Sequence, residues 1–110
     1  RHLFLEMAKR ADVVLEGFRP GVMDRLEIGW PRLRQVNPRL ILASISGYGQ
    51  EGTYRNTAGH DLNYLAQTGI LSLNASSERE SPVCPPIQIA DAGGGTYPPV
   101  IGILAALMER

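Results

Sequence analysis

The chain has 110 residues, 44% of them hydrophobic and 20% charged, and its formal net charge at pH 7 is zero. This length allows at most one domain, and the balanced charge gives no support for general binding to nucleic acid or to anionic membranes. Cys84 is the only cysteine, which excludes a disulfide within the chain and favours a reducing compartment, so we expect a cytoplasmic protein. No run of about 18 apolar residues occurs, so we expect no membrane span.

The first half of the sequence is typical of alternating helices and buried strands. Residues 3–8 place apolar side chains on one side of a charged background, as at the end of a helix. Val13–Phe18 and Leu40–Ser46 are short apolar runs that predict buried strands. Between them, helices are expected at 22–27 and 31–36. Apolar strands joined through helices indicate an α/β fold, with a parallel sheet covered on both faces.

The second half predicts loops and two helices. After a glycine-bearing loop at 47–57, a helix is expected at 61–71, followed by an irregular segment at 74–86 and a short extended piece at 87–90. The final helix should begin near Gly95 or Thr96, and because it is apolar around most of its circumference we expect it to be deeply buried. The chain does not begin with Met and its last segment lacks a helix-ending residue, so we expect part of a longer protein.

The most informative stretch is Ala58–Tyr64, which places an imidazole beside a carboxylate at a helix start. The helix dipole there favours the neutral imidazole of His60, which is a usable base near neutral pH. The neighbouring Asp61 could orient a ring, although capping the helix is its simpler role. A lone histidine is also often an ordinary surface residue, so His60 is a candidate rather than an assigned base.

A second carboxylate, Asp91, runs directly into three glycines. An aspartate before glycines often only forms a turn, but this one follows an apolar run, so we expect a half-buried carboxylate that can give or take a proton. The glycines, which lead into a helix, would direct backbone N–H groups at a developing anion. These glycines are Gly93, Gly94 and Gly95.

Two arginines, Arg19 and Arg25, flank the turn after the first strand. Ligands of open parallel sheets bind beyond strand ends, so both are candidate phosphate contacts, with solvated arginines as the equal alternative. The histidine, cysteine and aspartates lack any standard metal-ligand spacing, so no metal is expected.

At these residues the sequence resembles the class III CoA-transferase family, and within it the α-methylacyl-CoA racemases. The segments that carry the resemblance are, in order, 11–21, 37–41, 46–52, 58–64, 91–95 and 102–107 together with 109–110. The resemblance implies a fragment of a Rossmann-like parallel-sheet domain followed by active-site helices. Residues 1–57 would be the CoA-binding α/β part, and residues 58–110 the active-site loops and helices.

The resemblance also implies roles for individual residues. His60 and Asp91 would be the two catalytic acid–base groups, acting on an acyl-CoA substrate without a cofactor, in an interlocked homodimer. The remaining assignments are Gly17, Phe18, Arg19 and Arg25 at CoA, and Gly59, His60, Asp61, Leu62, Asn63 and Tyr64 around the acyl thioester. The adjacent prolines Pro98 and Pro99 depart from the expected helix-forming pattern and predict a shifted helix start.

The chemistry agrees with these roles. Inverting a carbon beside a thioester carbonyl requires a proton to leave one face and return on the other, which two groups of matched pKa can do. We therefore expect an isomerase that epimerises the α-carbon of 2-methylacyl-CoA thioesters. The family's transferases usually carry an aromatic residue in place of His60 and use the aspartate as a nucleophile. A CoA transferase with an acyl-aspartyl intermediate at Asp91, and an inactive truncated fragment, remain alternatives.

Overall fold

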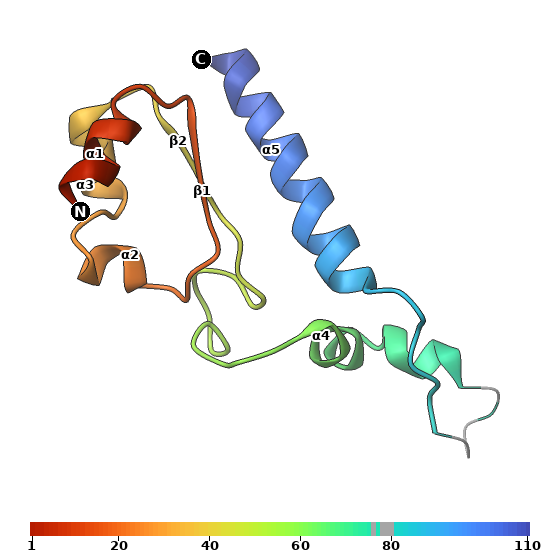
Figure 1. Ribbon diagram of the computed structural model, residues 1–110. Helices are drawn as coiled ribbons and strands as arrows, with labels where there is room; N and C mark the ends of the chain where they lie inside the picture. The colour runs from red at the N-terminus through yellow and green to blue at the C-terminus, as the bar shows by residue number, and fades with distance from the viewer. Residues whose placement is uncertain (76, 78–80) are drawn as a thin grey trace.

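The computed structural model describes residues 1–75, 77 and 81–110. Three short helices lie on one side of a small sheet, and one long helix lies on the other (Figure 1). The elements are, in chain order, α1 (His2–Ala8), β1 (Val13–Glu16), α2 (Val22–Arg25), α3 (Trp30–Val36), β2 (Ile41–Ser44), α4 (Asp61–Gln67), the 3₁₀-helix η1 (Ile70–Asn74), the π-helix η2 (Ile89–Gly94) and α5 (Gly95–Glu109).

The two strands form a parallel sheet, as the sequence predicts. Their register pairs Val13 with Ile41 and continues to Glu16 with Ser44. Helices α2 and α3 connect the strands, so the unit is strand, helix, strand. Parallel strands cannot be joined by a tight turn, and this crossover therefore sets the direction of both strands.

The core of this unit lies between the sheet and helices α1, α2 and α3. It contains Leu33, which is 0% exposed, and the strand residues Val14 and Leu42 pack against it. The prediction that both faces of the sheet are covered is only partly confirmed, because Leu15 on β1 remains 60% exposed. The other buried residues of this core are Leu5, Ala8, Met23, Ile28 and Leu40.

Asn37 ties the helices of this unit together. Its Nδ2 donates to the carbonyl oxygens of Ala8, at 3.1 Å, and Ala11, at 2.9 Å, while its Oδ1 accepts from the Arg39 N–H at 3.1 Å. Asn37 itself has extended dihedrals and ends α3, as expected for a residue before proline. One side chain therefore fixes the end of α1 against the chain that enters β2.

The secondary-structure boundaries of the second half differ from their prediction in two places. The single helix expected at 61–71 is divided into α4 and η1, because Gly69 adopts a left-handed conformation with φ of 80°. The extended piece expected at 87–90 is also wrong at its end, because Ile89 and Ala90 begin the π-helix η2. Within the segment expected to be irregular, residues 76 and 78–80 lie outside the described residues.

Helix α5 begins at Gly95, as predicted, and continues directly from η2. The prolines Pro98 and Pro99 lie inside it and do not shift its start. The expectation that α5 is deeply buried is wrong, because none of its residues is buried and Met108 is 89% exposed. The helix packs along β2 and leaves its other sides uncovered (Figure 1). In the part of the chain that is described, no helix is long and apolar enough to cross a membrane.

Candidate active site

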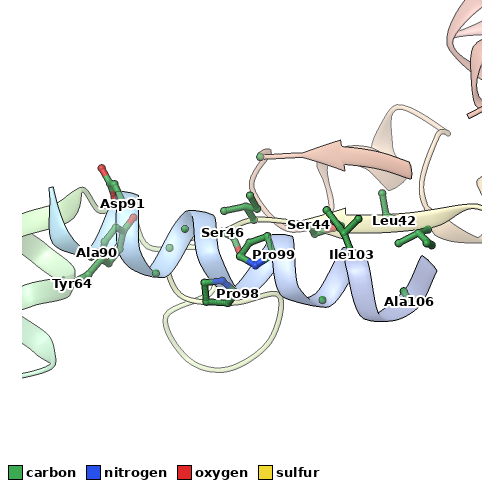
Figure 2. A pocket seen from close by; sticks show the side chains of 18 residues that line it. Leu42, Ser44, Ser46, Tyr64, Ala90, Asp91, Pro98, Pro99, Ile103 and Ala106 are labelled. Atoms are coloured by element: carbon green, nitrogen blue, oxygen red, sulfur yellow. The ribbon is translucent and has the colours of Figure 1, made fainter. Parts of the chain in front are cut away.

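A groove of about 910 Å³ lies between β2 and α5. Pro99 and Ile103 of α5 project toward the strand, with Asp91 and Tyr64 at one end of the groove and Ala106 at the other (Figure 2). The carboxyl end of β2 opens into it through Ser44, Ile45, Ser46 and Gly47. The groove is therefore elongated and largely apolar, with a carboxylate at one end.

His60 is held by hydrogen bonds of its main chain. It is the N-cap of α4, with φ of −132° and ψ of 175°, and its N–H donates to Oδ1 of Asn63 at 2.9 Å. Its carbonyl oxygen accepts from the N–H groups of Asn63, at 2.9 Å, and Tyr64, at 3.3 Å. The imidazole is exposed, and it does not line the groove.

Asp61 connects the two predicted motifs. Its side chain is buried, with 7% of the residue exposed, and its Oδ1 accepts the backbone N–H of Asp91 at 2.9 Å. This contact crosses 30 residues of sequence. Because Asp61 follows His60 directly, covalent geometry keeps the Cα atoms of His60 and Asp91 within roughly 12 Å of each other. The structure therefore brings the two motifs to one place.

Asp91 is the third residue of η2, and its side chain lines the groove. The expectation of half-burial is wrong, because Asp91 is exposed. The expectation that the following glycines offer free N–H groups is also wrong for Gly95, whose N–H donates to the carbonyl oxygen of Ala90. The helical run starts at Ile89, so its first-turn donors precede the glycines. Single π-helical turns within helices often mark functional sites.

Tyr64 organises the loop before His60. Its hydroxyl donates to the carbonyl oxygen of Gly59 at 2.8 Å, and its ring meets Tyr48 edge-on, with centroids 5.1 Å apart. Burial raises the pKa of the Tyr64 phenol, and the nearby Tyr48 and Asp91 raise it further. At Gly59, a Cβ would lie 2.7 Å from Cε1 of Tyr64, and at Gly47 a Cβ would overlap the phenol. Both glycines thus allow backbone to approach an aromatic ring.

Of the residues expected at CoA, Gly17, Phe18 and Arg19 directly follow β1, and Arg25 is the last residue of α2. Gly17 lines the groove, and Phe18 is 49% exposed beside it in sequence. Arg19 and Arg25 are exposed, and among the described residues neither guanidinium forms a hydrogen bond or ion pair with protein. Leu62 is exposed on α4. Within residues 1–75, 77 and 81–110, no three His, Cys, Asp or Glu side chains gather in a way that could hold a metal ion.

Several lining residues were not predicted from the sequence. Ser46 and Gly47 follow the carboxyl end of β2, and this position was the available signal, because ligands of parallel sheets bind there. Pro99 and Ile103 also line the groove, but the sequence pattern indicates only that they belong to an apolar helix. The contact between Asp61 and Asp91 was missed as well, because no spacing rule links residues so far apart.

The comparisons with known proteins agree on one family. The sequence model of CoA-transferase family III matches residues 1–110. The chain is 50% identical over 104 residues to the α-methylacyl-CoA racemase of Mus musculus, a match covering 94% of this chain and 27% of that protein. It is 39% identical over 110 residues to the acetyl-CoA:oxalate CoA-transferase of Acetobacter aceti, covering 100% of this chain and 28% of that one.

The solved structures give the same result. A hypothetical protein from Mycobacterium tuberculosis superimposes with a TM-score of 0.88 at 37% identity, covering 99% of this chain and 30% of that one. A CAIB/BAIF family protein from Brucella suis does so with a TM-score of 0.87 at 34% identity, covering 99% and 28%. The chain thus spans less than a third of the length of these relatives. On these matches, the chain belongs to CoA-transferase family III.

Proposed function

We propose that the protein carrying this chain is a racemase that epimerises the α-carbon of 2-methylacyl-CoA thioesters, with His60 and Asp91 as its two proton carriers. The observation that carries the proposal is the hydrogen bond from the Asp91 N–H to the side chain of Asp61, the residue after His60. This bond holds the main chain of Asp91 beside the residue that follows His60, which supports a site that uses both motifs. The 50% identity to a racemase agrees with this reaction.

In this mechanism, one group removes the α-proton and the other returns a proton to the opposite face of the carbon. His60 acts on one epimer and Asp91 on the other. Negative charge develops on the thioester oxygen, and backbone N–H groups at the start of a helix stabilise such charge. The first N–H groups of α4, those of Asp61 and Leu62, have no acceptor within their helix and suit this role.

The groove provides room for the acyl group. At Gly93 and Gly94, a Cβ would meet nothing within 4 Å, so space remains open beside Asp91. The CoA part would extend toward the carboxyl end of β1, where Arg19 and Arg25 would bind phosphates.

The test measures α-proton exchange in deuterated water, in the intact protein that carries this chain, starting from each epimer. General acid–base groups typically contribute about 10²–10⁴-fold, so we expect His60→Ala to lose exchange by about that factor from one epimer and Asp91→Asn from the other. The matched controls are His2→Ala and Asp12→Asn, which change an exposed residue of the same type elsewhere. Wild-type exchange from both epimers in His60→Ala would refute the assignment.

CoA transfer between carboxylic acids is the second candidate. It is supported by the 39% identity to an acetyl-CoA:oxalate CoA-transferase and by the exposed carboxylate of Asp91 in the groove, which a nucleophile requires. An acyl group on Asp91, detected by mass or by hydroxylamine trapping, would favour it. His60→Ala separates the two, because acyl-aspartyl formation does not require a second proton carrier.

A further inference from the structure

Asp61 is the one charged residue that is buried in the described part of the chain. Removing a carboxylate from water is costly unless hydrogen-bond donors compensate for the lost hydration. The donor in contact is the backbone N–H of Asp91, at 2.9 Å. A buried charge that bonds to main chain from a distant segment fixes that segment, since moving it would leave the charge without its donor.

The partner N–H also needs an acceptor. The first N–H groups of a helical run have no intrahelical partner, and Asp91 is the third residue of the run that begins at Ile89. The N-cap residue Gln88 supplies no side-chain cap, and Ala92 is the residue whose N–H bonds to the Gln88 carbonyl, at 3.1 Å. Asp61 therefore caps this helical run from another element.

The same carboxylate belongs to the first residue of α4. A negative charge is favourable at the N-terminus of a helix, and here two helical starts meet at one side chain. His60 precedes this side chain directly, and the N–H of Asp91 donates to it. A movement of the start of α4 away from the start of η2 would stretch the hydrogen bond between Asp61 and Asp91. This bond therefore couples the positions of His60 and Asp91.

We propose that Asp61 acts through its side chain as a positioning residue: this side chain fixes the main chain of Asp91 relative to His60 and does not touch the substrate. Its role in catalysis rests on the proposed function, in which Asp91 reacts. A displacement of about 1 Å in a catalytic group can lower the rate about 100-fold, so the bond sets the rate without taking part in the reaction.

The test compares three variants of the intact protein. Asp61→Ala removes the acceptor, Asp61→Asn keeps an oxygen at the same place without the charge, and Asp61→Glu keeps the charge but displaces the acceptor. The first measurement is amide hydrogen exchange of residues 88–95 without substrate. Loss of a hydrogen bond to a charged group should increase the rate of amide exchange about 10–100-fold, so we expect that increase in Asp61→Ala. The rate should remain near wild type in Asp61→Asn and be intermediate in Asp61→Glu.

The second measurement is steady-state kinetics. We expect kcat to fall about 10–100-fold in Asp61→Ala with little change in KM, and Asp61→Asn to recover most of it. Asp12→Ala is the matched control, because that carboxylate pairs with Arg110 at the other end of α5. It should leave both kcat and the exchange of residues 88–95 unchanged.

Two outcomes would overturn the proposal. Wild-type exchange at residues 88–95 in Asp61→Ala would show that the bond does not hold this segment. Loss of activity in Asp61→Asn with normal exchange would place the charge of Asp61 in the chemistry itself. If Asp61→Ala does not fold, the other two variants replace it: slower exchange in Asp61→Glu than in Asp61→Asn would then contradict the proposal. The exchange measurement uses no substrate, so it decides the role of Asp61 even where the wild-type protein fails to racemise.

Discussion

Residues 1–46 and residues 58–110 both carry apolar helices, but they use them differently. In the first region, helices and strands enclose a common core, and Leu33 at its centre has no exposed surface. In the second region, α5 lies along β2 with none of its residues buried, and Leu104 is 55% exposed. Both regions contain apolar helices, so the difference lies in what each helix packs against.

The two regions therefore have different tasks: the first provides a stable core, and the second places the candidate catalytic groups. The first region obtains its stability from buried area, which is insensitive to small movements of any single group. The second region buries Leu65 of α4, which is 1% exposed, but it also depends on individual polar contacts, such as Asp61 to Asp91 and Tyr64 to Gly59, each of which sets a position. The candidate proton carriers lie in the second region, where position matters more than buried area.

The largest difference in stability between the two regions is expected when a core side chain is truncated. Leu33→Ala should lower the free energy of unfolding by about 2–5 kcal/mol, because it removes buried methyl groups and leaves a cavity. Leu104→Ala, an identical change on α5, should have an effect of at most about 0.5 kcal/mol. Urea denaturation followed by circular dichroism measures both. An equal loss in both variants of the intact protein would show that α5 is as well covered as the core.

A substitution at Gly47, which lies before the second region, tests how closely the backbone packs against Tyr64 of that region. Gly47→Ala should destabilise by about 1–3 kcal/mol, because the new Cβ would overlap the phenol of Tyr64 and displace it. Gly102→Ala on α5 is the opposite case, since its Cβ would meet nothing within 4 Å, and it should stabilise by about 0.5–1 kcal/mol through helix propensity. Thermal unfolding measures both, and a destabilised Gly102→Ala would mean that something packs closely on that face.

The two regions also differ in how well the sequence predicts their structure. The strands, their parallel pairing and the helix starts were predicted because apolar runs are bounded by Gly and Pro, whose backbone effects are local. Asn37 and Pro38, for example, correctly end α3. Local chemistry of this kind requires no knowledge of the rest of the molecule.

The features that were missed depend on contacts that are distant in sequence. An apolar helix predicts burial, but its pattern does not say what covers it, so the burial of α5 was predicted wrongly. The π-helical turn at 89–94 includes residues that were expected to be extended, because short apolar runs are ambiguous. In the candidate site, the sequence predicts that the motifs of His60 and Asp91 share one place, whereas the bond from Asp61 that joins them leaves no local signal.

Tyr64 should give the second region its own alkaline pH dependence. Folding raises the pKa of Tyr64, so the unfolded chain loses its phenol proton at a lower pH than the folded chain. The stability that this group contributes is complete below the unfolded pKa of about 10 and is lost as the pH rises through the folded pKa. Tyr64→Phe should remove this alkaline loss, and should cost about 0.5–1.5 kcal/mol at neutral pH through the lost hydrogen bond to Gly59.

Denaturant midpoints across the alkaline range measure this effect, with Tyr97→Phe as the control because Tyr97 is 69% exposed. An alkaline slope that is the same in wild type and Tyr64→Phe would contradict the prediction. It would show that the phenol of Tyr64 is as exposed to solvent in the folded chain as in the unfolded chain. The second region would then be more open than the structure indicates.

The smallest effect is expected where the two regions meet at the far end of α5. Arg110 pairs there with Asp12, which precedes β1, and also donates to the Arg39 carbonyl oxygen at 3.1 Å. Asp12 is exposed, so a double-mutant cycle of Asp12→Ala and Arg110→Ala should give a coupling of only about 0.2–1 kcal/mol, which decreases as salt is added. A larger, salt-independent coupling would mean that this pair is shielded from water. In that case the far end of α5 would be fixed as firmly as the end held by the buried carboxylate of Asp61, and the helix would be a rigid wall of the groove along its whole length.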